Sequence, residues 1–175
     1  FVVLRSDVIR KELARLDPNQ PTPADQRARL YSPEMTRQTY TECLRQAEAR
    51  LGEGQRVCLD ATFGQAAFRA EALALADRLA VPAGWLVCQA SPEVVKARLA
   101  QRTHDASDAD WQVHLLATAA WEPPDPVTAE RMGVVEMSGQ PDHWLPQAIA
   151  HLTRWELAGP PSCNASSPPP AANES

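Results

Sequence analysis

Residues 1–13 read FVVLRSDVIRKEL, and this stretch sets the class of the fold. The apolar run over residues 1–4 is typical of a strand buried on both faces, and Ser6 is placed to cap a helix that runs to Leu16. The prolines within residues 17–23 end that helix, because proline cannot continue it. The opening is therefore a strand, a tight turn and a helix, followed by a loop to Leu30.

The same pattern repeats along the rest of the chain. Short apolar strands are predicted over residues 56–60, 85–88 and 134–137, and helices over residues 33–51, 65–79, 92–102, 108–122 and 143–157. Ser32, Ser91 and Asp108 stand where three of these helices begin and are expected to cap them. Strands that alternate with helices predict βαβ units and a mainly parallel α/β sheet.

Length and composition indicate one globular domain. The chain has 175 residues, near the roughly 150 of a typical domain, and its 44% hydrophobic and 22% charged residues are ordinary for a soluble protein. We expect one domain over residues 1–157 and a disordered tail, rich in Pro, Ser and Ala, over residues 158–175. No apolar run is long enough to predict a membrane span. The net charge of −5 argues against nucleic acid as a partner.

The cysteines and histidines lack the spacing of a metal site. Cys43, Cys58, Cys88 and Cys163 form no Cys-x-x-Cys pair, and the histidines form no His-x-x-x-His pair. We expect buried free thiols, a cytoplasmic location and no zinc centre. No serine lies in a Gly-x-Ser-x-Gly motif, which argues against an acyl hydrolase.

Two carboxylates follow predicted strands. Asp7 comes shortly after the first strand and Asp60 ends the next, with Thr62 two positions further on. Ligands of open α/β sheets sit beyond the carboxyl ends of the strands, so we expect both carboxylates at one rim. Helix capping or turn formation is the alternative role for each of them.

A cationic pair follows the predicted strand over residues 85–88. Arg98 and Arg102 are four positions apart, hence on one helix face, and they lead into the polar segment 103–110. Guanidinium groups match phosphate oxygens, so residues 98–110 are a candidate lid that clamps a nucleotide. A solvated helix end is the alternative.

A resemblance to a known family rests on five segments in order: LRSDVIRKEL (4–13), YSPEMTRQTY (31–40), VCLDATF (57–63), LVCQASPEVVKARLAQR (86–102) and DASDAD (105–110). Over about residues 1–140 the chain resembles the P-loop predicted kinase family of AAA-type ATP-binding proteins. That family is often joined to an upstream half similar to aminoglycoside phosphotransferases. It is more distantly similar to polynucleotide kinases, zeta toxins and chloramphenicol phosphotransferases.

The resemblance implies a function and a role for each candidate residue. It implies phosphoryl transfer from ATP, with Mg²⁺, to a hydroxyl of a small-molecule acceptor. Asp7 would be the general base, Arg10 would hold the substrate with Thr62, and the two lid arginines would contact the ATP phosphates. Asp60 would support Mg²⁺ through water or help to place the substrate, and no residue is assigned as a direct metal ligand.

The resemblance also implies a part that the sequence lacks. Kinases of this kind use a Gly-x-x-x-x-Gly-Lys-Ser/Thr loop, the Walker A motif, to cradle phosphates, and the 175 residues contain no such motif. The family has a three-layer α/β/α fold with strand order 2-3-1-4-5, so we expect Phe1 to begin the second strand, with the first strand and its loop missing. The chain alone is then expected to be inactive and prone to association. The alternative function is a non-catalytic module that senses nucleotide or packs against an upstream phosphotransferase-like domain.

Overall fold

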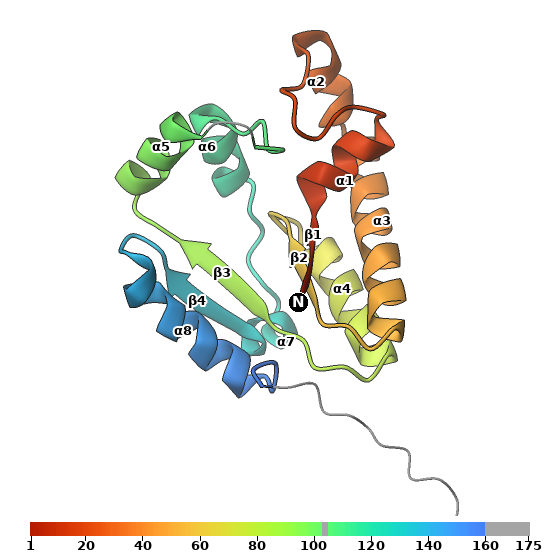
Figure 1. Cartoon of the computed structure of the whole chain (residues 1–175), viewed down its shortest axis with the longest axis vertical. Helices are drawn as coiled ribbons and strands as arrows, with labels where there is room; N and C mark the ends of the chain where they lie inside the picture. Colours follow the sequence, from red (N-terminus) through yellow and green to blue (C-terminus); the bar gives the residue numbers. More distant parts are fainter. Residues whose placement is uncertain (103–104, 160–175) are drawn as a thin grey trace, which may run out of the picture.

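The computed structural model describes residues 1–102 and 105–159 (Figure 1). Its first half runs through β1 (Val2–Arg5), α1 (Ser6–Leu13), α2 (Ala24–Leu30), α3 (Pro33–Gly52), β2 (Val57–Asp60) and α4 (Ala66–Arg78). Its second half runs through β3 (Trp85–Gln89), α5 (Pro92–Gln101), α6 (Trp111–Ala119), α7 (Pro126–Glu130), β4 (Met132–Glu136) and α8 (Pro141–Arg154). Strands and helices alternate through both halves, as predicted.

The strands pair in parallel, which confirms the α/β class. β1 pairs with β2 from Val2 opposite Val57 to Arg5 opposite Asp60, and β3 pairs with β4 in the same sense. The two pairs are separate two-stranded sheets, with no ladder joining them within the described residues. Each described strand therefore has one unpaired edge. The observed neighbours, β1 with β2 and β3 with β4, are those that the expected order 2-3-1-4-5 gives without its first strand.

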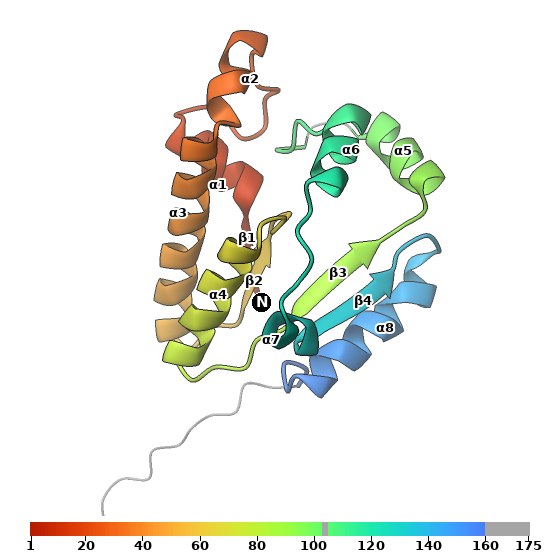
Figure 2. The ribbon, with the colours of Figure 1, turned by 180° about the vertical axis from the view of Figure 1, so that it is seen from behind.

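Helices cover the outer side of each sheet. α3 contacts both β1 and β2, and α8 contacts β4. Both views show α3 and α8 on the sides of the two sheets that face away from each other (Figures 1 and 2). The first strand is consequently covered on one face only, and Val3 is 56% exposed, so the prediction of burial on both faces is wrong.

An aromatic cluster joins the two halves. Tyr40 of α3 stacks on Phe68 of α4 with ring centroids 4.0 Å apart, and Phe63 meets Tyr40 edge to face. Trp85, the first residue of β3, lies edge to face against Phe63 at 4.6 Å. The second sheet is thereby anchored to the core of the first half.

Two helix starts differ from the predicted ones. Arg5 rather than Ser6 is the N-cap of α1, and Ser6 is buried in the first turn. Asp110 caps α6 by accepting a hydrogen bond from Val113 N at 2.9 Å, so the prediction that Asp108 caps this helix is wrong. The Asp108 side chain is occupied elsewhere, as described below.

Two short helices lie where loops were predicted. α2 forms within the segment assigned as a loop to Leu30, because the strong helix formers after Pro23 outweigh the neighbouring prolines. α7 begins at Pro126, with Asp125 as its N-cap, beyond the helix expected to end at residue 122.

The cysteines are less uniform than predicted. Cys43 is buried in α3, and burial raises the pKa of its thiol to about 11. Cys58 and Cys88 are exposed because they lie on strand faces that no helix covers, so the prediction of buried thiols is wrong for both. Cys163 and the predicted tail from residue 160 onward lie outside the described residues. Of the helices that the structure describes, none has the length and hydropathy to cross a bilayer.

Candidate functional site at the carboxyl ends of the strands

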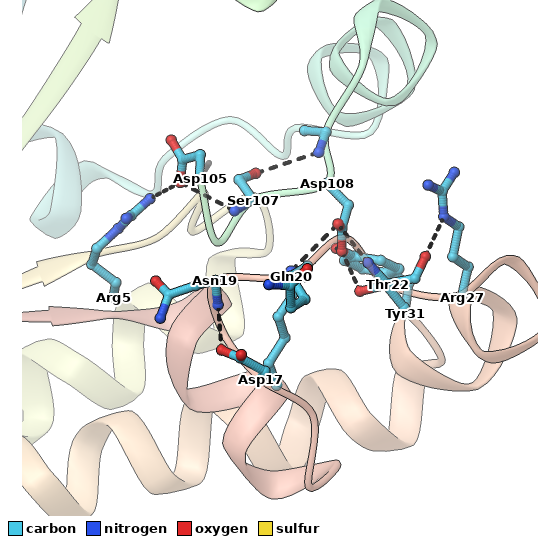
Figure 3. Close-up of polar contacts among 12 residues, drawn as sticks. Arg5, Asp17, Asn19, Gln20, Thr22, Arg27, Tyr31, Asp105, Ser107 and Asp108 are labelled. Atoms are coloured by element: carbon cyan, nitrogen blue, oxygen red, sulfur yellow. Dashed lines mark hydrogen bonds and ion pairs between the residues drawn. The ribbon is translucent and has the colours of Figure 1, made fainter. Parts of the chain in front are cut away.

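The carboxyl ends of β1 and β2 bring opposite charges together. Parallel pairing places Arg5 opposite Asp60, and Arg5 Nε donates to Asp60 Oδ2 at 3.3 Å. Arg5 Nη2 donates to Asp105 Oδ1 at 2.6 Å, across from the second half of the chain (Figure 3). The hydrogen bond with Asp105 raises the pKa of Arg5 against the effect of burial, and the nearby charges of Asp60 and Asp7 add to this. We call the end of the molecule around these four residues the rim.

Asp7 lies in the first turn of α1, directly beyond β1. Its carboxylate is close enough to Arg5 and Tyr31 for its charge to raise the pKa of both side chains. Acids in the first turn of a helix are favoured by the helix dipole, so local structure also suits a carboxylate here. The rim thus holds Asp7 and Asp60, the two carboxylates that the sequence predicted there. The Arg5 guanidinium lies beside Asp60 at the ends of β1 and β2.

Arg10 is turned into the protein rather than out toward solvent. It is 8% exposed, and its Nη1 donates to Leu30 O at 3.2 Å and to Thr36 Oγ1 at 3.1 Å. The Tyr31 ring lies 5.3 Å from the guanidinium carbon, in a cation–π arrangement. Arg10 Nε is buried and has no hydrogen-bond partner within residues 1–102 and 105–159. The guanidinium therefore joins α1 to α2 and α3 and keeps one donor unused.

The turn after Asp60 is held in a strained backbone conformation. Phe63 has φ of 44°, a left-handed conformation that is costly for a bulky residue. Its N–H donates to Tyr40 Oη at 2.9 Å, and its carbonyl accepts from Arg69 Nη1 at 2.6 Å. Tyr40 Oη also lies 3.3 Å from Thr62 Oγ1, so the same tyrosine fixes the position of the Thr62 hydroxyl.

The two lid arginines point to different partners. Arg98 Nη2 donates to Met137 O at 2.6 Å, beside the end of β4. Arg102 is the C-cap of α5 rather than part of its face, and its Nε lies 3.5 Å from Asp105 Oδ2. In this arrangement neither guanidinium is aimed at Asp7 or Asp60.

A polar cluster that sequence reasoning missed surrounds Asp108 (Figure 3). The Asp108 carboxylate accepts hydrogen bonds from Thr22 N at 3.0 Å, from the Thr22 hydroxyl, and from Tyr31 Oη at 3.0 Å. Lys11 Nζ lies 3.4 Å away and also donates to Gln20 O at 2.8 Å. Burial alone would raise the pKa of Asp108, but the hydrogen bonds from Thr22 and Tyr31 and the Lys11 charge lower it. The one sequence signal was the density of aspartates in residues 105–110.

Within the described ranges, no three His, Cys, Asp or Glu side chains gather as a metal-ligand set. The Asp60 carboxylate is 60% exposed and pairs with Arg5.

The family of the chain follows from a comparison with known protein families. Residues 1–124 match the family described as AAA domain, and this match covers more than two thirds of the sequence. The chain belongs to the AAA domain family, a class of P-loop nucleotide-binding proteins. No curated protein matches the sequence.

Proposed function

We propose that this chain forms the acceptor and lid portions of an ATP-dependent phosphotransferase that acts on a small molecule. The observation that carries the proposal is the rim, where Arg5 pairs with Asp60 at the carboxyl ends of parallel strands and Asp7 stands in the helix turn directly beyond β1, in a chain of the AAA domain family. Ligands of α/β folds bind at this edge, so the carboxylates stand where a substrate would arrive.

Asp7 is the proposed general base. A carboxylate within reach of an acceptor hydroxyl takes its proton as the hydroxyl attacks, and Asp7 stands in the first turn of α1, directly beyond β1. Arg10 lies one turn along the same helix and is proposed to hold an anionic or polar group of the acceptor, for which its guanidinium would turn away from Leu30 and Thr36. Thr62, fixed by Tyr40, offers a hydroxyl on the neighbouring strand end.

Arg98 and Arg102 remain the proposed phosphate contacts of a lid over residues 98–110. Their present partners are a backbone carbonyl and one carboxylate, both exchangeable for phosphate oxygens. Asp60 is proposed to act on hydrated Mg²⁺ or on the substrate.

These 175 residues do not fit ATP by themselves, because they contain no Gly-x-x-x-x-Gly-Lys-Ser/Thr loop to bind its phosphates. ATP would supply the phosphoryl group, and the loop that holds it would have to come from residues outside this sequence. We therefore propose that the isolated chain does not turn over ATP. We also propose that the same polypeptide carries an upstream domain similar to aminoglycoside phosphotransferases.

A non-catalytic module that senses nucleotide is the second candidate. It is favoured by the intramolecular use of Arg10, Arg98 and Arg102, each of which already has a partner in the same chain. Such a module would bind nucleotide without transferring phosphate.

Labelled phosphate transfer separates the two candidates. The whole product of the reading frame that contains these residues is incubated with γ-labelled ATP, Mg²⁺ and a panel of small hydroxyl compounds. Transfer to an acceptor supports the phosphotransferase, whereas nucleotide binding without any transfer supports the sensing module. The 175-residue chain, assayed in parallel, is expected to be inactive.

A further inference from the structure

Residues 105–110 connect the second half of the chain to the first, and we call them the strap. They lie between α5 and α6, yet two of their side chains bind residues of β1, α1 and the segment that leads into α2 (Figures 1 and 3). Asp105 binds Arg5 at the rim, and Asp108 binds Thr22, Tyr31 and Lys11. The strap therefore crosses the carboxyl ends of the strands beside the proposed acceptor site.

The Asp108 end of the strap is buried and strongly held. Its carboxylate is 6% exposed and Lys11 is 1% exposed, so water does not screen this pair. Hydrogen bonds to an ionised group are the stronger kind, and Asp108 accepts three of them from Thr22 and Tyr31. Removing the carboxylate would leave the Lys11 charge buried with the Gln20 carbonyl as its one remaining partner among the described residues.

The Asp105 end is more accessible. Arg5 and Asp105 are 38% and 27% exposed, and Arg5 is shared with Asp60. Asp105 also lies 3.5 Å from Arg102 Nε and accepts a hydrogen bond from Ser107 N at 3.2 Å. Exposed ion pairs contribute little net stability and are screened by salt. An anion with several charged oxygens can replace one carboxylate on a guanidinium, because the geometry of the contact is the same.

We propose that the strap is a conformational device, pinned at Asp108 and released at Arg5 by an anionic ligand that takes the place of Asp105. When Asp105 leaves Arg5, the strap turns about its Asp108 end and opens the rim. The pinned end also keeps Tyr31 over Arg10, because the Tyr31 hydroxyl donates to Asp108. This proposal rests on the contacts alone and does not depend on the proposed transferase activity.

Hydrogen exchange of the full 175-residue chain tests the pinned end. Asp108→Asn is expected to speed exchange of residues 105–110 and 15–31 about tenfold, the population change that corresponds to about 1.4 kcal/mol. Thr22→Val should act in the same direction and more weakly. Asp25→Asn is the matched control, since it removes one negative charge from the exposed side of α2 and none of the strap contacts. Peptides from β4 report on global unfolding and should not change.

The released end is tested with Asp105→Asn and with sodium tripolyphosphate as the anion. Asp105→Asn should speed exchange of residues 105–110 and leave residues 15–31 unchanged. Millimolar tripolyphosphate should produce the same change in the wild-type chain and none in Asp105→Asn. The proposal is overturned if Asp108→Asn exchanges no faster than Asp25→Asn, or if tripolyphosphate leaves the strap unchanged or slows its exchange.

Discussion

Two cations, Arg69 and Lys11, are each 1% exposed and are held in different ways. Lys11 faces a carboxylate, whereas the bonds of Arg69 go to backbone carbonyls. Arg69 Nη1 donates to the carbonyls of Phe63 and Gly64, and its Nη2 to those of residues 122 and 123. One guanidinium thus ties the strained turn beyond β2 to the segment that follows α6.

Replacing this guanidinium should destabilise the fold markedly. Arg69→Met fills much of the space but removes one buried and three part-buried hydrogen bonds to backbone carbonyls, and we expect the free energy of unfolding to fall by about 3 kcal/mol. Urea denaturation followed by circular dichroism measures this. Arg78→Met is the control on the same helix, because Arg78 is exposed and pairs with the exposed Glu48. Equal stability of both variants would show that Arg69 is not a structural tie.

Asp108 should make stability depend on acid pH. Its pKa is lowered in the folded protein, so its contribution is complete above the ordinary aspartate value of about 3.9 and is lost as the pH falls through the lower folded value. Tyr31 stays neutral in this range, because burial and the Asp108 charge raise its pKa. The unfolding free energy of Asp108→Asn should therefore fall less steeply between about pH 4 and pH 2 than that of the wild type. The two slopes should differ by no more than the uptake of one proton on unfolding accounts for.

Denaturation series at each pH, with Asp25→Asn alongside, measure the effect. If the unfolding free energies of the wild type and Asp108→Asn fall with the same slope against pH, the contacts of Asp108 with Thr22, Tyr31 and Lys11 do not stabilise its ionised carboxylate.

The candidate residues differed in how far the sequence could place them. Asp7 and Asp60 follow from the strand pattern, because parallel strands carry their carboxyl ends to one edge. The burial of Arg10 and the role of Asp108 could not be predicted, because both depend on contacts between segments far apart in the chain, such as Asp108 with Thr22. The periodicity of apolar residues indicates which side chains share a face of one helix or strand. It carries no information on contacts between distant segments.

Among the elements, helix starts with a local signal were predicted well. Ser32 and Ser91 accept hydrogen bonds from the N–H groups of Met35 and Val94, each followed by proline at the first helical position. α2 and α7 were missed because prolines flank or open them, and proline suits a helix start as well as a loop.

The packing of α8 on β4 depends on one glycine. A Cβ at Gly133 would overlap the ring of His151, which lies against this strand and has Nε2 3.2 Å from Val134 O. Gly133→Ala should therefore destabilise the fold by about 2 kcal/mol through steric overlap.

Gly52 is the matched control, because a Cβ there meets nothing within 4 Å at the end of α3. Gly52→Ala should be neutral or slightly stabilising. Thermal unfolding of the two variants gives the comparison. A Gly133→Ala protein as stable as Gly52→Ala would contradict the close approach of α8.

At the scale of the whole molecule, two small sheets are held by a few contacts. The aromatic cluster of Trp85 with Phe63 joins them on one side, and the strap joins them at the rim. The α/β class was predictable from alternating elements. The division into two pairs was not predictable from the strand patterns, which do not specify neighbours, but it agrees with the order 2-3-1-4-5 without its first strand that the resemblance implied.

Unpaired edges and exposed apolar side chains favour self-association. Val3 and Val134 are 56% and 51% exposed on the strands. We expect the 175-residue chain to associate as its concentration rises, and Val134→Lys to shift association to higher concentration. Sedimentation velocity over a concentration series measures both. A chain that stays monomeric throughout would show that these edges are protected.

The phosphotransferase proposal depends most directly on Asp7. The decisive measurement is the rate of phosphate transfer from ATP to an acceptor, made on the whole product of the reading frame with Asp7→Asn. Asp17→Asn is the matched control, because Asp17 is an exposed turn residue whose carboxylate accepts from Asn19 N. We predict that Asp7→Asn lowers the rate by about a hundredfold or more, as loss of a general base does, while Asp17→Asn leaves it unchanged. An Asp7→Asn protein that transfers phosphate at the wild-type rate would contradict the assignment of the rim as the catalytic site.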